Sequence, residues 1–535
     1  MHIANEFDYI VIGGGSAGSV VASRLSESGR DSVALFEAGG KGDSVIVRTP
    51  LAAVAMLPTK LNNYAFETVP QSGLNGRKGY QPRGRCLGGS SAINAMIYTR
   101  GHASDYDHWA QLGNAGWSYK DMLPYFIKSE RNADLKDSYH GTDGPLQVSH
   151  LRSDHPYQNI FLTAAQQVGF PLCNDFNGSE QEGLGIYQVT HVDGERCSAA
   201  RAYLFPYLGK RRNLHIHTNV LVEKIVVESG RAIGIIYQKN GVQKTARARK
   251  EVILCAGAIQ SPQLLMLSGI GPKEHLHELN IPVVMDLPGV GQNLQDHPDF
   301  IFGYEAKDIS LVGISAAGTL KLAKEFLRYL KLRRGMFASN FAEAGGFLKT
   351  DPSLVAPDIQ LHFVVALVDD HARKMRMGHG YSCHVCVLRP YSRGQIRLAS
   401  RDPSASPFID PGFLSDERDM DTMVQGFKLT RQLMDAPVFQ KIRSRDVFTS
   451  RAQTDQDIRD LIRQRADTVY HPVGTCKMGN DSMAVVDSRL CVKGIKGLRV
   501  VDASIMPTLI GGNTNAPVIA IAEKAADMIT ADQKG

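Results

Sequence analysis

Tryptophan and cysteine are scarce in this chain, with 2 Trp and 8 Cys among 535 residues. Eight scattered cysteines are too few for a disulfide framework at this length, and they indicate reduced thiols and a cytoplasmic location. Cys383 and Cys386, in "SCHVCV", have the spacing of a metal-binding pair, but no second pair accompanies them. We therefore expect no metal site, and we expect these two thiols to pack on one side of a strand.

The chain also lacks long hydrophobic runs and a large excess of one charge. No uninterrupted apolar segment approaches about 18 residues, so we expect no transmembrane helix. The N-terminal "MHIANEFDYIVIGGG" has no basic region, which argues against a cleavable signal. The net charge of +6 is small for this length and argues against a dedicated nucleic-acid-binding protein. The length predicts two or more domains.

A glycine-rich fingerprint is present near the N-terminus, in "YIVIGGGSAGSVVASRLSES". The apolar run at residues 9–12 predicts a buried strand. Gly13, Gly15 and Gly18 follow in the phase of a dinucleotide-binding turn, before a segment with helical spacing. Glu37, 19 residues after Gly18, ends the second predicted strand, where a carboxylate can accept hydrogen bonds from a ribose. The pattern predicts a dinucleotide site and leaves NAD and FAD as alternatives.

Two further stretches bear on that choice. "PRGRCLGGSSAINAMIYTRG" at 82–101 and "GAIQSPQLLMLSGIG" at 257–271 closely resemble the two signature motifs of the glucose–methanol–choline (GMC) family of FAD-dependent oxidoreductases. The resemblance covers nearly the whole chain and is weakest at about 300–390. It implies FAD, bound by an α/β Rossmann-like domain, and an α+β substrate domain built on an antiparallel sheet. From the residues alone, "GGSSAIN" suits either a flat polar ring or a tight loop before a helix start.

The resemblance also assigns individual residues to the cofactor. Some members of the family attach FAD covalently through a histidine in the "GGSSAIN" loop, and Ile93 stands in that place here, which implies noncovalent FAD. Taken with the fingerprint, the predicted FAD-binding residues are Gly13, Gly15, Ser16, Ala17, Gly18, Glu37, Ala38, Leu87, Gly88, Gly89, Asn94, Ala95, Met96, Ile97, Val222, Asp502, Ala503 and Pro517.

The two domains are expected to be discontinuous. Strand-like runs such as "KEVILCAG" support a mixed α/β core for the FAD-binding domain. Within the substrate domain, "YSCHVCVLRP" and "GQIRLAS" are predicted to be neighbouring antiparallel strands joined through "YSRG". The predicted FAD-binding domain comprises residues 1–152, 201–299 and 467–535, and the predicted substrate domain comprises residues 153–200 and 300–466.

Two C-terminal motifs, "HPVGTC" and "GGNTNAP", match the active-site motifs of the family. His471 matches the family's catalytic histidine, and a neutral imidazole suits a base because its unperturbed pKa is roughly 6.5. Asn515 matches the common partner of that histidine, and its amide can donate to the substrate oxygen as the alkoxide develops. From the residues alone Asn515 is a helix-capping residue before "PVIAIAEKAADMI". The two interpretations are compatible.

The stretch "LKLAKEFLRYLKLRRG", residues 320–335, predicts a basic amphipathic helix. Leu320, Ala323, Leu327 and Leu330 fall on one helical face, and six Lys and Arg residues supply a basic surface. Such a helix either lies on an anionic membrane or packs its apolar face on the core with a solvated charged back. The resemblance makes the membrane alternative relevant, since membrane quinones accept electrons from several dehydrogenases of this family.

The resemblance is strongest to the branch that holds choline dehydrogenase, medium-chain alcohol dehydrogenases and polyethylene glycol dehydrogenase. It implies oxidation of a primary alcohol, either a medium-chain alcohol or polyethylene glycol, to the aldehyde, with a quinone as electron acceptor. Choline needs an aromatic cage, and Tyr64 stands where many relatives carry Trp, which weakens choline. The alternatives are a choline dehydrogenase, an oxygen-using alcohol oxidase and, from another class, a hydroxynitrile lyase or photodecarboxylase of the same fold.

Overall fold

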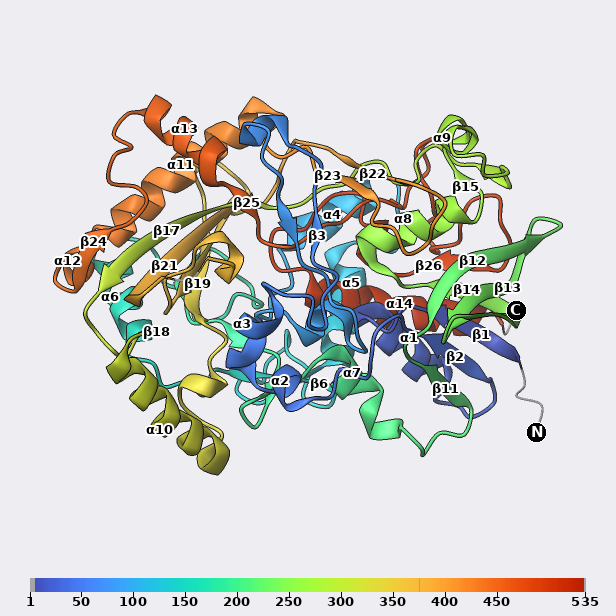
Figure 1. Ribbon diagram of the computed structural model, residues 1–535, viewed down its shortest axis with the longest axis horizontal. Helices are drawn as coiled ribbons and strands as arrows, with labels where there is room; N and C mark the ends of the chain where they lie inside the picture. The colour runs from blue at the N-terminus through green and yellow to red at the C-terminus, as the bar shows by residue number, and fades with distance from the viewer. Residues whose placement is uncertain (1–4, 375, 534–535) are drawn as a thin grey trace.

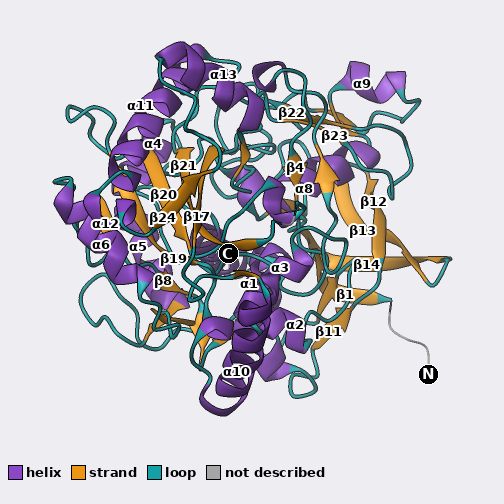
Figure 2. Cartoon of the chain, turned by 60° about the vertical axis from the view of Figure 1, so that its left-hand side comes forward, coloured by secondary structure: helices purple, strands orange, loops and turns teal. Residues whose placement is uncertain are grey.

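The computed structural model describes residues 5–374 and 376–533. Figure 1 shows two sheets side by side, a seven-stranded sheet on the right and an eight-stranded sheet on the left, with helices packed around both. The turned view of Figure 2 keeps the same two groups of strands apart. The α/β architecture with a second, antiparallel sheet confirms the predicted fold class.

The seven-stranded sheet has the order β11-β2-β1-β14-β13-β12, with β26 paired to β14. Its β11, β2, β1, β14 and β26 are parallel, and β12 and β13 add an antiparallel extension. The central strands are continuous apolar runs because both faces of a parallel sheet are covered. The strands are β1 Glu6–Ile12, β2 Val33–Phe36, β11 Leu214–His217, β12 Leu221–Glu228, β13 Arg231–Lys239, β14 Val242–Leu254 and β26 Leu498–Val500.

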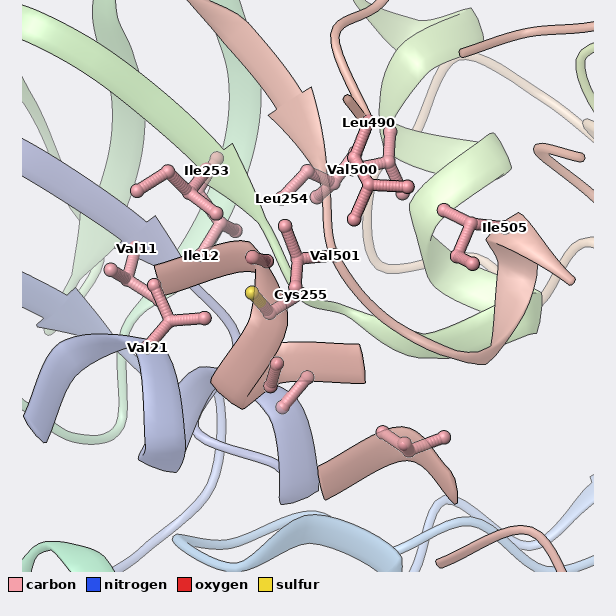
Figure 3. Close-up of a cluster of buried hydrophobic side chains, with 14 of the residues drawn as sticks. Val11, Ile12, Val21, Ile253, Leu254, Cys255, Leu490, Val500, Val501 and Ile505 are labelled. Atoms are coloured by element: carbon pink, nitrogen blue, oxygen red, sulfur yellow. The ribbon is translucent and has the colours of Figure 1, made fainter. Parts of the chain in front are cut away.

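The two ends of the chain meet beside this sheet. Helix α1, Ser16–Leu25, packs against the last helix, α14, Asn515–Asp532. Arg24 Nη2 lies 2.8 Å from Oε1 of the buried Glu523, which joins the two helices by an ion pair. Figure 3 shows side chains of β1, β14 and β26 meeting residues of α1 in one core. The C-terminal segment is therefore part of the dinucleotide-binding core.

The eight-stranded sheet is antiparallel, with the order β24-β17-β21-β20-β19-β7; β18 pairs with β21, and β25 pairs with β17. Helix α11, Glu417–Met434, packs on β20 and β21, and Phe300, Phe363 and Phe427 contribute to a second hydrophobic core. The strands are β7 Gly183–Gly185, β17 Pro298–Ala306, β18 Gly313–Ile314, β19 Ala342–Leu348, β20 Ile359–Val364, β21 Gly378–Val387, β24 Arg443–Asp446 and β25 Asp467–Thr468.

The predicted pairing of "YSCHVCVLRP" with "GQIRLAS" is wrong. The first stretch is β21, which pairs with β17, β18 and β20, and the second contains β22, Gln395–Arg397, which pairs with β23, Phe408–Asp410. The chain leaves the eight-stranded sheet after β21, because the backbone N–H of Ile396 donates to the carbonyl of Gly291 at 2.6 Å. Ile396 and Ile409 belong to the first core. Residues 395–410 thus pack with the core of the seven-stranded sheet.

The cysteines are all unpaired. Cys383 and Cys386 are both buried on β21, but three positions along a strand place them on opposite faces. Cys383 lies in the second core and Cys386 in a smaller neighbouring cluster. The prediction that both thiols pack on one side is therefore wrong.

One group in the described part of the chain has the spacing of metal ligands, Asp137, His140 and Asp175. Both nitrogens of His140 already contact carboxylates, Nδ1 that of Glu130 at 3.2 Å and Nε2 that of Asp175 at 3.0 Å. Burial lowers the pKa of His140, but its hydrogen bonds to Asp175 and Glu130 prevail and raise it to about 9. A protonated imidazole has no free lone pair, so this group is an ion-pair cluster.

Helix α10, Ala316–Leu332, projects from the molecule at the lower left of Figure 1. Tyr329 is its one buried residue, whereas Leu320, Leu327 and Leu330 are 63%, 66% and 51% exposed. The amphipathic helix is therefore present, and the alternative in which its apolar face packs on the core is wrong. None of the described helices has the length and apolar character needed to span a bilayer.

Candidate active site

The turn between β1 and α1 brings backbone N–H groups to the edge of the seven-stranded sheet. Gly13 has φ +96°, and a Cβ on Gly18 would lie 1.8 Å from the carbonyl oxygen of Gly13. Only glycine lets the helix start so close to the strand. Gly15 precedes α1, and no side chain caps the first turn. The N–H groups of this turn are ready to bind a phosphate.

Glu37 follows β2 and lies beside this turn. Its carboxylate accepts the backbone N–H of Gly14 at 2.9 Å and that of Gly39 at 2.7 Å. Burial raises the pKa of Glu37, and these two hydrogen bonds act in the opposite direction. Because a carboxylate offers about four acceptor positions, capacity remains for a ribose hydroxyl. Glu37 lines the cavity at the place that the sequence predicts for it.

Residues 89–97 form the wall opposite the α1 turn. A Cβ on Gly89 would lie 2.7 Å from the Cα of Gly15, so the two backbones are in contact. Asn94 Oδ1 accepts from Nη1 of the buried Arg196 at 2.8 Å. The small residues of "GGSSAIN" therefore let this backbone lie directly against that of the α1 turn. The buried guanidinium of Arg196 holds Asn94 at the end of the stretch.

A cavity of about 520 Å³ runs from the α1 turn to the strands of the eight-stranded sheet. Four predicted residues do not line the cavity: Gly18, Leu87, Gly88 and Pro517. The other predicted residues line the cavity: Gly13, Gly15, Ser16, Ala17, Glu37, Ala38, Gly89, Asn94, Ala95, Met96, Ile97, Val222, His471, Asp502, Ala503 and Asn515.

Asp502 lies at the middle of the cavity. Its Oδ2 accepts from the backbone N–H of Gly257 at 2.9 Å and from the hydroxyl of Ser261 at 2.5 Å. Burial raises the pKa of Asp502 against the effect of these bonds. Gly257 and Ser261 belong to α8, Gly257–Leu267, so the second signature stretch serves to position this carboxylate.

His471 lies at the far end of the cavity between two polar partners. Its Nδ1 is 3.0 Å from Nδ1 of His297, and its Nε2 is 3.2 Å from Nδ2 of Asn513. Nε2 of His297 is 3.1 Å from the carbonyl oxygen of Leu388. A carbonyl only accepts, so this Nε2 carries the proton and Nδ1 of His297 is an acceptor. His471 therefore donates from Nδ1 and keeps its lone pair on Nε2.

Burial keeps His471 and its neighbours His297 and His362 neutral. It lowers the pKa of His471 well below the ordinary value, and repulsion from His297, His362 and Arg83 lowers it further. Burial likewise lowers the pKa of His297 to about 3 and that of His362 to about 3. A neutral imidazole with its lone pair on Nε2 is ready to accept a proton.

Asn513, and not Asn515, lies against His471. Oδ1 of Asn513 accepts from Nε2 of Gln360 at 3.0 Å, which turns the amide NH₂ toward the imidazole. Asn515 is the first residue of α14 and accepts from the Ser16 hydroxyl at 2.8 Å. The predicted pairing of Asn515 with His471 is thus corrected. Helix α14 begins between these two asparagines, so their side chains point in different directions. Asn513 contacts His471, and Asn515 contacts Ser16 of the α1 turn.

The end of the cavity beyond His471 is largely apolar. The aromatic side chains that line the cavity are Phe36, Tyr64, Phe341 and Tyr470, and both tryptophans, Trp109 and Trp117, are buried away from it. Exposed cationic side chains, Lys374 and Arg376, also line the cavity, at its mouth. The apolar lining comes from Val312, Ile314, Phe341, Val364, Ala366, Leu367 and Val368.

The residues present fit FAD. Two helix starts without a side-chain cap, those of α1 and α14, meet at one end of the cavity and suit a pyrophosphate. Toward the other end, Asn340 Nδ2 donates to the carbonyl of Ala95 at 2.6 Å. Its buried Oδ1 has no partner among the described residues and needs a donor from a bound molecule. The α1 turn, residues 89–97 and residues 502–503 would hold the cofactor between these ends.

Sequence reasoning missed four of the polar residues around the cavity: Asn513, His297, Asn340 and Arg196. Asn513 stands in a motif that the sequence singled out, two positions from the residue chosen. His297, in "NLQDHPDF", meets His471 across 174 positions of sequence. The local sequence around His297 is Asp-His-Pro-Asp. This pattern does not by itself indicate an active site.

The comparisons with known proteins agree with this architecture. Profiles of the GMC oxidoreductase family match residues 7–299 and 390–522. An alcohol dehydrogenase [acceptor] of Pseudomonas putida is 45% identical over 98% of this chain and 95% of its own length. The mitochondrial choline dehydrogenase of Homo sapiens is 45% identical over 98% of this chain and 90% of its own length.

Solved structures show the same fold. Pyridoxine 4-oxidase from Mesorbium loti superposes with a TM-score of 0.88 at 31% identity, over 97% of this chain and 98% of the other. A formate oxidase of Aspergillus oryzae reaches a TM-score of 0.91 at 28% identity, over 99% of both chains. With a phosphate-binding turn, a cavity that fits FAD and a neutral histidine at its far end, the chain belongs to the GMC oxidoreductase family and is an FAD-dependent oxidoreductase that acts on alcohols.

Proposed function

We propose that this protein oxidises an uncharged primary alcohol to its aldehyde. The observation that carries the proposal is the Nε2 lone pair of His471, which is fixed by the contact of Nδ1 with His297 and faces the amide of Asn513 in the cavity. Oxidation of an alcohol removes a proton from the hydroxyl and a hydride from the carbon that bears it. Bound FAD supplies the hydride acceptor.

His471 accepts the hydroxyl proton at Nε2 in this proposal. Burial keeps the imidazole neutral before the reaction, and Nδ1 continues to donate to His297 as the ring becomes charged. Asn513 has its amide NH₂ 3.2 Å from the same nitrogen, so it can donate to the substrate oxygen while negative charge develops there. The proton and the negative charge are thus handled by two neighbouring groups.

The substrate is an alcohol with an apolar chain of medium length. The apolar lining suits an alkyl chain. Lys374 and Arg376, which also line the cavity, are paired with Asp370 and Asp369, so the described part of the lining offers no unpaired carboxylate there for a cation such as choline. Neither tryptophan lines the cavity, and Tyr64, Phe341 and Tyr470 supply less aromatic surface than a cage built with tryptophan. Polyethylene glycol, uncharged and terminated by a primary hydroxyl, is the second candidate.

The electron acceptor is a membrane quinone in this proposal, and the protein works in the cytoplasm in contact with the inner face of the membrane. The eight unpaired cysteines suit a reducing compartment. The relative from Pseudomonas putida is an alcohol dehydrogenase [acceptor], a name that supports an acceptor other than NAD.

A panel of substrates under air tests the proposal. Purified enzyme is given primary alcohols of increasing chain length, a short polyethylene glycol, choline and a cyanohydrin, each with and without a quinone or dye acceptor. We expect acceptor reduction to be fastest with medium-chain alcohols and to exceed hydrogen peroxide formation. Preference for choline, peroxide formed at a comparable rate, or cleavage of the cyanohydrin without flavin bleaching would each contradict it.

A further inference from the structure

Helix α10 presents its apolar side to solvent and its polar side to the protein. The residues that turn inward are Gly318, Lys321, Glu325 and Tyr329, which recur at helical spacing. The opposite side carries Leu320, Ala323, Leu327 and Leu330, all exposed, with Phe326 at the border at 42% exposure. This orientation is the reverse of that of an ordinary surface helix, whose apolar stripe faces the core.

Specific polar contacts hold the helix in this orientation. Oε2 of Glu325 accepts the backbone N–H of Met336 at 3.0 Å. The Tyr329 hydroxyl donates to the carbonyl of Gly194 at 3.3 Å, and Arg333 Nη1 lies 3.2 Å from Glu195 Oε1. Since each contact lies on the inward side, the outward direction of the leucines is a consequence of the fold.

The outward side also carries basic residues along one border, Lys324, Arg328 and Lys331. The other cations of residues 320–335 are occupied elsewhere: Lys321 and Arg333 turn inward, and Arg334, like Arg328, pairs with Asp154. The one acidic residue, Glu325, also faces inward. Lys324 and Lys331 are exposed and form no ion pair with any residue that the structure describes. The exposed leucines are therefore flanked by free positive charge.

The mouth of the cavity opens next to this helix. Residues 312–314, directly before α10, line the cavity together with the exposed Val54 of helix α3, Ala53–Met56. Figures 1 and 2 both show α3 and the neighbouring helix α2, Val45–Arg48, close to α10. Helix α2 adds the exposed Val45 and Ile46 to this side of the molecule.

We infer that the outward side of α10 is a docking surface for an anionic lipid bilayer, with its leucines inserted at the interface and its lysines and arginines against acidic headgroups. Apolar residues flanked by Lys and Arg on a helix that lies in the membrane plane are the features of interfacial binding. Docking in this way places the cavity mouth at the membrane surface, where a lipid-dissolved acceptor or alcohol can enter. This last step rests on the proposed function.

A second copy of the chain fits this surface poorly. A two-fold interface places the same patch on both partners, so the basic border would face itself. Lys324, Arg328 and Lys331 lie along one edge of the exposed leucines, and like charges at short range repel. The charge pattern therefore favours an anionic surface as the occupant.

Vesicle binding by the FAD-loaded enzyme tests the inference. We expect sedimentation with phosphatidylcholine vesicles that contain about one-third phosphatidylglycerol, weak sedimentation with phosphatidylcholine alone, and release by salt. The double variant Leu327→Ser/Leu330→Ser should bind at least about tenfold more weakly, because two apolar side chains no longer insert. Lys324→Gln and Lys331→Gln should each weaken binding about fivefold.

Matched controls lie on the hairpin of β13 and β14, at the right of Figure 1. Val242→Ser and Lys244→Gln change an exposed valine and an exposed lysine there and should leave vesicle binding unchanged. As a direct readout, Leu327→Trp should shift its emission to the blue on anionic vesicles while Val242→Trp does not, since both native tryptophans are buried.

Three results overturn the inference. The first is equal vesicle affinity of wild type and the leucine double variant, and the second is absence of binding to anionic vesicles. The third is a dimeric wild type that the double variant converts to monomer, which makes the surface a protein interface. Alcohol-dependent dye reduction without vesicles should be unchanged in the double variant. Loss of wild-type dye reduction with vesicle binding intact would instead contradict the proposed function.

Discussion

The two ends of the cavity are built in different ways. At the dinucleotide end, the strand, turn, helix and carboxylate follow one another between residues 6 and 37, and only the surrounding walls, such as the start of α14 at Asn515, come from distant parts of the sequence. At the catalytic end, His471 meets His297 and Asn513 from three segments that are far apart in the chain. Changes at the first end should therefore alter cofactor affinity, and changes at the second end should alter chemistry.

The largest effect on chemistry is expected from His471→Ala. The variant removes the proton acceptor but none of the backbone contacts of the α1 turn, so it should fold and retain FAD. The rate of flavin bleaching by alcohol in a rapid-mixing experiment should fall by about 10²–10⁴-fold, the contribution of a positioned base. A near-normal rate in a variant with full FAD content would show that the histidine only packs beside the site.

The two asparagines of "GGNTNAP" give a matched comparison. Asn513→Ala removes the amide beside His471 and should lower the bleaching rate by up to about 10²–10³-fold, as loss of one oxyanion donor does. Asn515→Ala removes only the acceptor for Ser16 and should leave that rate within a few-fold of wild type. A reversed order of the two variants would restore Asn515 as the catalytic partner.

At the other end, Glu37→Ala should weaken FAD binding rather than turnover of the loaded enzyme. The variant loses charge-assisted hydrogen bonds worth about 1.5–3 kcal/mol each, so the Kd for FAD should rise by roughly 10- to 150-fold. Titration of apoenzyme with FAD measures this, and Glu274→Ala on the exposed helix α9, Lys273–Glu278, is the control. Unchanged affinity would mean that Glu37 serves only the backbone of Gly14 and Gly39.

A smaller effect is expected from His297. His297→Leu removes the acceptor for Nδ1–H of His471, so the proton can move to Nε2 and block the lone pair. The bleaching rate should fall by about 2- to 12-fold, the net value of one hydrogen bond. His297→Gln, whose amide oxygen can accept from the same N–H, should recover most of it. Equal rates in the two variants would show that His297 does not set the tautomer.

The smallest change is expected with pH. Because the pKa of His471 is lowered well below its ordinary value, the ring stays neutral as the pH falls, and the bleaching rate should be flat above pH 7. The rate should still be at its plateau at about pH 6.5, the unperturbed pKa, and should decline only well below it. A rate that rises between pH 7 and 9 would show that a group of higher pKa controls the proton transfer.

The same histidines link stability to pH. The pKa values of His297 and His362 are lowered to about 3 in the folded protein, so in acid the unfolded chain takes up protons that the buried rings do not. The free energy of unfolding should therefore fall as the pH drops below about 6.5 and be unaffected by these groups above it. Urea denaturation at two pH values measures the difference.

How far the sequence predicts this protein depends on how local each feature is. The strand–turn–helix around Gly13 and Gly18 and the amphipathic pattern of α10 are local, and both were predicted. The pairing of β21 failed because β17, β18 and β20, and not the next strand along the chain, are its neighbours. The prediction chose Asn515 instead of Asn513 because both asparagines stand in the same motif at the start of a helix. The sequence does not show which of the two side chains faces His471.

By itself the sequence determined the dinucleotide turn, because that turn depends on residues within one strand–turn–helix unit. The FAD cofactor, the two kinds of sheet and the histidine motif were implied by the resemblance of long motifs to the GMC family. The tertiary structure alone decided which atoms meet. It directs the lone pair of His471 through Leu388 and His297, and it selects Asn513 through Gln360. It also turns the leucines of α10 outward, because polar contacts on the opposite side hold the helix. Periodicity shows that a helix has an apolar face, but only packing decides which way that face points.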